Sequence, residues 1–284
     1  MTIALVTAAA LPGLFADDRI LLEALRRRGL AAEPAIWEDR LYPWADAELV
    51  VIRSAWDYSW RRAAFLDWAD GVPAARLWNP ASVVRWNTHK RYLLDLADRG
   101  VAIVPTHLIP AGTPAHLATL LEAQGWDDVV LKPAVSQSGR YAMRVARSDL
   151  SAGLAHLDRV LPHEDMLVQP FMPDIAIRGE LSLTFIDGRF THAVRKRAAP
   201  GDFRIHDDYG GTVEREEPEP GWLATAEAAM AAVGEPLLYA RVDLVEGPDG
   251  RPAVMELELV EPELFFAHAP DAADLLVDAI AARR

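Results

Sequence analysis

The sequence has no cysteine and no long apolar run. Without cysteine, disulfides, thiolate metal sites and cysteine nucleophiles are all excluded. A membrane-spanning helix needs about 20 consecutive apolar residues, and no stretch approaches this, so we expect no membrane partner. The apolar start at residues 2–7 has no basic flank, so we also expect no signal peptide. These absences favour a reducing compartment and predict a cytoplasmic protein.

The chain also lacks an excess of positive charge. Its net charge is −13, and proteins that bind nucleic acid need a surplus of lysine and arginine to contact the phosphate backbone. Nucleic acid is therefore excluded as a partner. The acidic residues are spread along the chain, which is typical of a solvated surface. A length of 284 residues with 51% hydrophobic residues predicts two or three compact lobes or one large α/β unit.

Lysine is scarce, since only three of the 29 lysine and arginine residues are lysines. A compact ammonium group binds phosphate as a point charge, where a planar guanidinium does not always fit. The three positions therefore either belong to a phosphate site or are remnants of a compositional bias, and composition alone leaves both readings open. These lysines are Lys90, Lys132 and Lys196.

The order of expected elements predicts a mixed α/β protein with three lobes. A β-α-β-rich opening, to about residue 80, indicates a small doubly wound lobe. Residues 82–99 are expected to be helical, 101–109 to be a strand, and a helix is expected to run from Pro114 to Gly125. From Gly179 onward the pattern is typical of β-hairpins. The predicted lobes are residues 1–84, 85–169 and 170–284.

A hairpin over residues 238–260 gathers charged side chains. The Asp-Gly pair at 249–250 favours a tight type I′ turn, which places Asp243 opposite Glu256 and Arg241 opposite Glu258. Positions two apart share one face of a strand, and opposed carboxylates about 5 Å apart repel each other. They therefore favour a bound cation, and carboxylate oxygens suit Mg²⁺ or Mn²⁺. The alternative is an ordinary solvent-facing strand pair. The other face is apolar and is expected to pack in the core: Val242, Leu244, Met255, Leu257 and Leu259.

A second hairpin is indicated by the Asp-Gly pair at 187–188. The same turn geometry places Glu180 opposite Arg195, as a cross-strand ion pair. It places Lys196 opposite Gly179, which would leave room for a ligand beside the ammonium group. The alternative for Lys196 is an exposed lysine on a strand.

Together these motifs resemble the ATP-grasp superfamily of carboxylate–amine ligases over about residues 85–262. The resemblance implies an N-terminal doubly wound lobe, which binds substrate, and two further lobes that clamp ATP. Lys90 in NTHKRYLL and Lys132 in VVLKPAV match the two ATP-contacting lysines of the family, and Lys196 matches a lysine near the nucleotide. The Walker A and GxGxxG phosphate motifs are both absent.

The resemblance also implies the remaining nucleotide and metal residues. A small-residue loop would fold over the phosphates and a hinge would hold adenine, with Asp174 near the ribose. The loop residues are Ser136, Ser138 and Gly139, and the hinge residues are Gln169, Pro170, Phe171 and Met172. Asp243, Glu256 and Glu258 match a metal triad that usually ends in asparagine. The implied cofactors are ATP and two Mg²⁺ or Mn²⁺ ions.

Within the superfamily, several stretches resemble glutathione-synthetase-type ligases and especially the O-ureido-serine cyclo-ligases that close the cycloserine ring. These stretches are RSAWDYSW at 53–60, GDFR at 201–204, DDYGG at 207–211 and MELELVEPELFF at 255–266. They suggest substrate contacts from Arg53, Ser54, Asp57, Arg204 and Glu261. The alternative for Arg53 is a surface arginine at a strand end. Trp56 and Tyr58 could line the same pocket, although a core role is expected for both aromatic residues.

The implied activity is an ATP-dependent ligation of an amino-acid-like small molecule. A carboxylate becomes an acyl-phosphate, and an amine-type nitrogen attacks it with release of ADP and phosphate. Arg241, Arg204 and Lys196 are the expected catalytic residues, because positive charge stabilises the oxyanion that develops. A small-molecule kinase on the same fold and a non-catalytic nucleotide-binding protein are the alternatives. The oligomeric state is left open; a homodimer would use an apolar face of the first lobe's helices.

Overall fold

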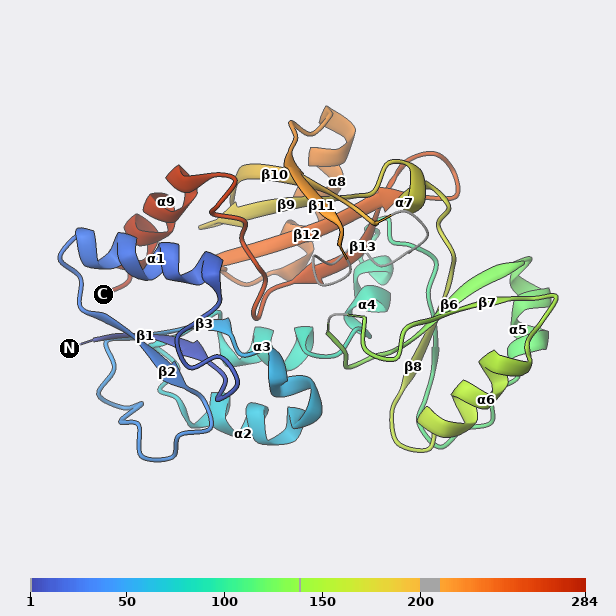
Figure 1. The fold of residues 1–284 in the computed structure, drawn as a ribbon, viewed down its shortest axis with the longest axis horizontal. Helices are drawn as coiled ribbons and strands as arrows, with labels where there is room; N and C mark the ends of the chain where they lie inside the picture. The colour runs from blue at the N-terminus through green and yellow to red at the C-terminus, as the bar shows by residue number, and fades with distance from the viewer. Residues whose placement is uncertain (1, 138, 200–209) are drawn as a thin grey trace.

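The computed structural model describes residues 2–137, 139–199 and 210–284. Within these ranges the strands form three sheets, two of four strands and one of five. In Figure 1 the first sheet lies at the left, the sheet of β5 to β8 lies at the right, and the five-stranded sheet lies between them and above. The predicted α/β class is confirmed. No helix in the described ranges is long and apolar enough to cross a membrane.

The first sheet is parallel, with the strand order β2-β1-β3-β4. Its strands are β1 (Ile3–Thr7), β2 (Ala32–Ile36), β3 (Leu49–Ser54) and β4 (Leu77–Trp78). Every residue of β1 and β3 is buried, as expected for apolar strands of a parallel sheet covered on both faces. The helices that cover it in Figure 1 are α1 (Ala16–Arg27), α2 (Arg62–Gly71), α3 (Ala81–Asn87) and the C-terminal α9 (Pro270–Ala281).

The C-terminal helix α9 belongs to the core of the first sheet. Leu276 and Ile280 of α9 are fully buried in one cluster with Leu21 and Leu25 of α1. The apolar face of α1, the expected place for a dimer contact, is therefore at least partly covered by the chain's own C-terminus. The predicted boundaries after residues 84 and 169 stay a proposal.

The second four-stranded sheet is antiparallel and carries the motif around Lys132. Its order is β5-β8-β6-β7. The strands are β5 (His107–Ile109), β6 (Asp128–Pro133), β7 (Met143–Ala146) and β8 (Met166–Pro170), and the helices beside them are α5 (Leu117–Gln124) and α6 (Ser151–Val160). Gly125 ends α5 in the left-handed conformation that glycine adopts without strain, as predicted.

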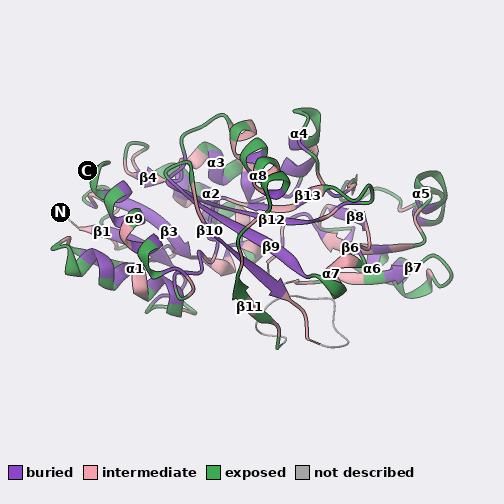
Figure 2. Ribbon diagram, turned by 90° about the horizontal axis from the view of Figure 1, so that it is seen from above, coloured by how far each residue is buried: buried purple, intermediate pink, exposed green. Residues whose placement is uncertain are grey.

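The five-stranded sheet is antiparallel and has the order β11-β10-β9-β12-β13. Its strands are β9 (Glu180–Ile186), β10 (Arg189–Arg197), β11 (Thr212–Arg215), β12 (Tyr239–Glu246) and β13 (Pro252–Glu258). The long purple strands in the middle of Figure 2 are β9 and β12, which are buried along almost their whole length. Packed around this sheet are α4 (Tyr92–Asp98), α7 (Asp174–Ile177) and α8 (Pro220–Val233).

Two expectations need correction. The helix expected over 82–99 is two helices, α3 and α4, separated at residues 88–91. In this break the amide of Lys90 donates to the carbonyl of Ala134, at 2.7 Å, which ties the break to the end of β6. The strand expected over 101–109 is restricted to β5, because Pro105 has no amide hydrogen for a ladder.

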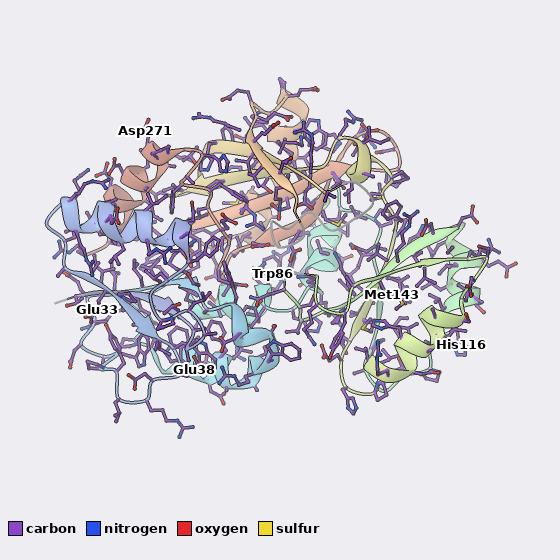
Figure 3. The ribbon with its side chains drawn as sticks, viewed as in Figure 1. Glu33, Glu38, Trp86, His116, Met143 and Asp271 are labelled. Carbon is purple, nitrogen blue, oxygen red and sulfur yellow. The ribbon has the colours of Figure 1, made fainter. Side chains whose placement is uncertain are left out.

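Charged side chains cover the outside of the molecule. Figure 3 shows Glu33 on the edge strand β2 of the first sheet and Asp271 at the start of α9, and both are exposed. Both positions are typical of acidic residues on a solvated surface.

Candidate active site

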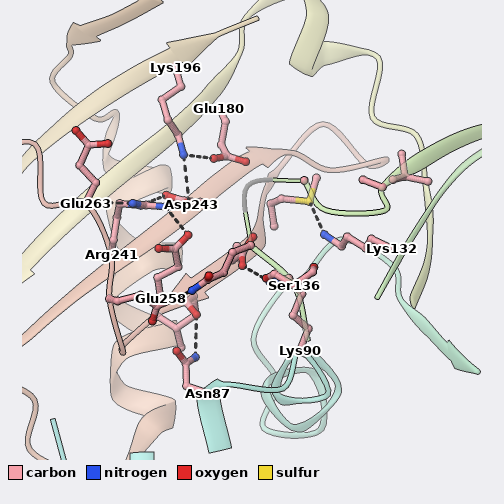
Figure 4. A pocket seen from close by; sticks show the side chains of 18 of the residues that line it. Asn87, Lys90, Lys132, Ser136, Glu180, Lys196, Arg241, Asp243, Glu258 and Glu263 are labelled. Carbon is pink, nitrogen blue, oxygen red and sulfur yellow. Dashed lines mark hydrogen bonds and ion pairs between the residues drawn. The ribbon is translucent and has the colours of Figure 1, made fainter. Parts of the chain in front are cut away.

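A cavity of about 300 Å³ lies where the three sheets meet. All three lysines of the chain line it, although they come from a helix break, from β6 and from β10. Figure 4 shows them around one space with Arg241, Asp243 and Glu258. Lys90, Lys132 and Lys196 are far apart in the sequence, so only the fold brings their positive charges together.

Lys90 is positioned by the break between α3 and α4. Its Nζ donates to Glu256 Oε1 at 2.5 Å and to the carbonyl oxygen of Ser136 at 3.0 Å. The side chain therefore connects β13 with the loop that follows β6. Burial alone would lower the pKa of Lys90, but Glu256 raises it above its ordinary value, so the ammonium is charged.

Lys132 points from β6 into the cavity with few partners. Its Nζ lies 3.8 Å from Met255 Sδ, which is a weak acceptor. Burial lowers the pKa of Lys132 to about 8, because the nearby Glu256 offsets only part of the desolvation of the ammonium group. A phosphate group would supply the missing negative charge.

Lys196 pairs with Glu180 and not with the predicted Gly179. Its Nζ lies 2.6 Å from Glu180 Oε1 and 3.3 Å from Asp243 Oδ2. A β-bulge between Phe190 and His192 shifts the register by one residue, so Glu180 faces Lys196 on the neighbouring strand. The predicted Glu180–Arg195 pair is therefore wrong.

Arg195 instead donates to Glu216, at 2.6 Å and 3.1 Å. The missing side chain of Gly179 leaves room for the protein's own backbone and not for a ligand, since a Cβ there would collide with the carbonyl oxygen of Lys196.

The predicted register of the acidic hairpin is confirmed: Asp243 faces Glu256 and Arg241 faces Glu258. The predicted two-residue turn is wrong, because the hydrogen bond from the amide of Gly247 to the carbonyl of Arg251 closes a longer loop. A bulge at Met255 offsets this difference and restores the pairing.

The bulge also changes the direction of one side chain. Strict alternation of faces predicts that Met255 packs in the core with Leu257, but Met255 lines the cavity beside Lys132. In a β-bulge two residues on one strand oppose a single residue on the other, which interrupts the alternation of faces.

Asp243 accepts four hydrogen bonds from residues that the structure describes. Its Oδ1 accepts from Ser182 Oγ at 2.6 Å and from Arg241 Nε at 2.9 Å, and its Oδ2 accepts from Arg241 Nη2 at 2.9 Å and from Lys196 at 3.3 Å. Burial alone would raise the pKa of Asp243, but Arg241 and Lys196 lower it well below its ordinary value. Asp243 is thus ionised and saturated with donors.

Glu256 and Glu258 differ from Asp243 because each has a carboxylate oxygen without a hydrogen bond to any described residue. Oε1 of Glu258 accepts from Arg241 at 2.5 Å, and Oε1 of Glu256 accepts from Lys90. Burial raises the pKa of Glu258 to about 7, with Arg241 opposing the shift. Burial would also raise the pKa of Glu256, but Lys90 and Lys132 lower it.

The carboxylate oxygens of the site fit a divalent cation only in part. Two carboxylates on one face of β13 each offer an oxygen, which suits a hard cation that keeps several waters. Asp243 could join them only if Arg241 or Lys196 released it. Accordingly, no group of three histidine or acidic side chains in the described residues is arranged to hold a metal ion.

The predicted phosphate loop and adenine hinge both border the cavity. Ser136 and Gly139 line it, as do all four hinge residues, 169–172, whereas Ser138 lies outside the described residues. Arg140 fixes the end of the loop with two hydrogen bonds to Glu164, at 2.9 Å and 2.6 Å. Asp174 is not among the lining residues and accepts from Arg178 at 2.9 Å.

The predicted substrate residues are only partly brought together. Glu261 lines the cavity, and burial raises its pKa to about 8. Arg53, Ser54 and Asp57 do not line it: Arg53 is fully buried against Asp18, Ser54 donates to the same aspartate, and Asp57 bonds to Trp37 and Arg61. Arg204 lies outside the described residues.

Sequence reasoning missed several residues that the structure places in the cavity wall: Phe15, Glu180, Met255 and Glu263. For Glu180 a signal existed, because polar residues recur at 180, 182 and 184 and therefore share one face of β9. Phe15 comes from a loop of the first sheet, and nothing in the sequence indicates its position.

The chain resembles proteins of known activity along its whole length. Residues 3–79 match the family described as the N-terminal domain of the D-cycloserine synthetase DcsG. The cycloserine biosynthesis protein DcsG of Streptomyces lavendulae is 36% identical, over 99% of this chain and 98% of that protein. The glutathione synthetase of Parasynechococcus marenigrum is 29% identical, over 84% of this chain and 72% of that protein.

Solved structures give the same result. The crystal structure of D-cycloserine synthetase DcsG superposes with a TM-score of 0.90 at 35% identity, covering 100% of this chain and 99% of that one. The D-alanine–D-alanine ligase of Bacillus anthracis shares the fold, with a TM-score of 0.70 at 16% identity, covering 100% and 97%. The chain therefore belongs to the ATP-grasp ligases, within the family of D-cycloserine synthetase DcsG, and is an ATP-dependent enzyme that forms C–N bonds.

Proposed function

We propose that this ligase activates the carboxylate of O-ureido-serine as an acyl-phosphate and closes the cycloserine ring. A carboxylate oxygen attacks the γ-phosphorus and ADP leaves. The nitrogen bonded to the side-chain oxygen of the same molecule then attacks the acyl carbon, loses a proton and displaces phosphate. Water removes the carbamoyl group from this nitrogen as carbon dioxide and ammonia, which leaves the cycloserine ring. The observation that carries this proposal is the cavity in which Lys90, Lys132 and Lys196 face the carboxylates of β12 and β13. The full-length similarity to a cycloserine biosynthesis protein supports the choice of substrate.

The lysines and Arg241 have distinct roles in this reaction. Lys90 and Lys132 hold the phosphates, and the loop that begins at Ser136 excludes water from them. Lys196 stays charged between two carboxylates at the edge of the same space. Arg241 is held rigidly by Asp243 and would stabilise the oxyanion that forms when the nitrogen attacks. The same role for Arg204 stays a prediction.

ATP and a divalent metal ion are the cofactors of this family, and we propose two ions. Glu256 and Glu258 would hold the metal, since each keeps one carboxylate oxygen that no described residue binds. When bound, the metal neutralises charge on the phosphates. Asp243 would be a third metal ligand only if Arg241 or Lys196 released it.

The remaining predictions stay part of this proposal. Residues 1–84 would bind substrate, residues 85–169 and 170–284 would clamp ATP, and the enzyme would act in the cytoplasm. A homodimer remains a prediction that measurement of the mass in solution can check.

The experiment is an ADP-release assay with O-ureido-D-serine, with and without Mg²⁺, followed by addition of hydroxylamine. A ligase that forms an acyl-phosphate yields a hydroxamate under these conditions. ADP release without hydroxamate, together with a phosphorylated product, would instead identify a small-molecule kinase. Absence of ADP release with this substrate, but activity with another amino acid, would overturn the cycloserine assignment alone.

A further inference from the structure

The segment that follows β13, residues 260–264, is irregular, yet side chains bind every one of its carbonyl oxygens. The contacts are Tyr239 Oη to Val260 at 2.8 Å, Trp56 Nε1 to Glu261 at 3.0 Å, Arg53 Nη2 to Pro262 at 2.5 Å, Arg241 Nη1 to Glu263 at 3.0 Å and His192 Nε2 to Leu264 at 2.8 Å. Because buried carbonyls need such partners, this segment is fixed in one position.

The partners come from two different sheets. Arg53 lies near the end of β3 in the first sheet, and Trp56 follows that strand. Tyr239 and Arg241 lie on β12. Arg53 is fully buried, pairs with Asp18 at 2.8 Å and stacks over the ring of Tyr239 at 4.8 Å. The stretches 53–60 and 255–266 are therefore in direct contact, and the first holds the second against the cavity.

This fixed segment presents the carboxylate of Glu261 to the cavity. Glu261 is only 9% exposed and accepts a hydrogen bond from Gln137 Nε2. In the described part of the chain, no lysine or arginine lies within 4.0 Å of this carboxylate, whereas Glu180, Asp243, Glu256 and Glu258 each have a cationic partner. A neutral amide does not supply the counter-charge that a buried carboxylate needs.

Two aromatic rings stand at the same end of the cavity. Phe15 and Trp56 both line it, with ring centroids 4.8 Å apart, and the indole of Trp56 donates to the backbone of Glu261. Aromatic faces attract cations, so the wall beside Glu261 is suited to a small organic cation. It is much less suited to a second anion.

We propose that Glu261 binds the α-ammonium group of the substrate, with Phe15 and Trp56 as the wall beside it and Gln137 as its neutral partner. The inference rests on the proposed function and names the group by which this site selects an amino acid. A carboxylate accepts about four hydrogen bonds, so Gln137 and an ammonium group can bind Glu261 together. Arg53 and Trp56 are positioning residues, because they act through the backbone of residues 261 and 262.

The test measures the binding of D-cycloserine and of N-acetyl-D-cycloserine by calorimetry, with Mg²⁺ and ADP present. Both carry the ring, but only the first has a free amino group. We expect the wild-type protein to bind D-cycloserine at least about tenfold more tightly, as a charge-assisted hydrogen bond implies. Glu261→Gln removes this preference and leaves the weaker binding of the acetylated compound unchanged.

Gln137→Ala is the matched control, since it removes the neutral partner and keeps the carboxylate, so the preference for the amine persists. Trp56→Phe keeps the aromatic wall but releases the carbonyl of Glu261, and we expect a partial loss of the preference. If Glu261→Gln does not fold, Trp56→Phe takes its place in the test.

Equal binding of both compounds to the wild-type protein, no binding of D-cycloserine, or a preserved preference in Glu261→Gln would overturn the inference. Its failure is distinct from failure of the proposed function, which the separate ADP-release assay measures. If the protein prefers the compound with the free amino group but shows no turnover, the inference about Glu261 stands and the proposed reaction is wrong.

Discussion

Arg241 donates to both carboxylate oxygens of Asp243, at 2.9 Å each, from two positions away on the same face of β12. The parallel fork is the strongest geometry for an arginine–carboxylate pair. It fixes the guanidinium so that Nη2 also reaches Glu258 and Nη1 reaches the carbonyl of Glu263. Asp243 therefore acts first as the support of Arg241 in this structure, and the metal ligands that we propose are Glu256 and Glu258.

The substitution Asp243→Asn tests whether Asp243 supports Arg241 or binds the metal. We expect turnover to fall at least about a hundredfold, because Arg241 loses its ionic support and oxyanion stabilisation of this kind is worth that much. The affinity for Mn²⁺ in the presence of ADP, measured by electron paramagnetic resonance, stays within about threefold of the wild type.

Glu256→Gln is the comparison for this experiment. We expect it to lower Mn²⁺ affinity at least about tenfold and to abolish metal-dependent turnover, while the circular dichroism spectrum stays that of the wild type. Equal losses of Mn²⁺ affinity in the two variants would mean that Asp243 leaves Arg241 and coordinates the metal directly.

The low pKa of Lys132 predicts a pH dependence of nucleotide binding. Burial lowers this pKa to about 8 in the free protein, and phosphate groups raise it again because they favour the charged ammonium. Below pH 8 the ammonium is already charged, so this residue adds no pH dependence. Above pH 8 binding must take up a proton, and ADP affinity falls as pH rises, by up to roughly tenfold per unit.

Calorimetry of ADP binding between pH 7 and 9.5, in buffers of different ionisation enthalpy, measures both the affinity and the proton uptake. Lys132→Arg is the control, since a guanidinium stays charged throughout this range and takes up no proton. A wild-type affinity that is flat above pH 8, without proton uptake, would show that Lys132 is charged in the empty site.

The buried ion pair of Arg53 and Asp18, which lies outside the cavity, predicts that loss of Arg53 strongly lowers the free energy of unfolding. Arg53→Met leaves Asp18 buried without its partner, and removing one member of a buried ion pair costs about 3–5 kcal/mol of the free energy of unfolding. The control is Arg61→Met: Arg61 is exposed and pairs with Glu38 at 2.6 Å, so we expect a loss below about 1 kcal/mol. Urea unfolding followed by fluorescence measures both. Similar small losses would contradict the structural role assigned to Arg53.

The two hairpins show what the sequence can and cannot predict. Alternation of side chains along a strand predicted the shared face of Arg241, Asp243, Glu256 and Glu258, and the structure confirms this register. The prediction succeeded although the turn was wrong, because a bulge at Met255 offset the longer loop. A bulge depends on tertiary packing, and the turn residues carry no signal for it.

In the hairpin of β9 and β10, the register shift caused by the bulge between Phe190 and His192 is not reversed along the rest of the pairing. The turn at 187–188 forms where expected, with Ile186 opposite Arg189, but from His192 onward every pair is shifted by one residue. The shift moves Glu180 opposite Lys196. The motifs thus located the lysines along the chain, whereas the partners of each lysine required the three-dimensional register. The same holds for Arg53, whose partners at positions 18 and 262 are far away in sequence.

Gly179 is the position at which this shifted register can be tested. It has a φ of +77°, and a Cβ there would collide with the backbone carbonyl of Lys196, so the substitution Gly179→Ala must displace the strand that carries the ammonium group. Gly188 has a similar φ of +73°, but a Cβ added there would meet no atom within 4 Å, and it is therefore a matched control. Gly188→Ala costs only the strain of the left-handed conformation, about 1–2 kcal/mol.

We expect Gly179→Ala to cost about 1–3 kcal/mol more than this control, because overpacking adds to the strain, and to lower kcat/KM through the displaced Lys196. Urea unfolding and the ADP-release assay measure the two effects. If Gly179 instead faced open space beside a ligand, as the unshifted register predicts, both alanine variants would lose the same stability. In that case the bulge between Phe190 and His192 would have no consequence for the position of Lys196.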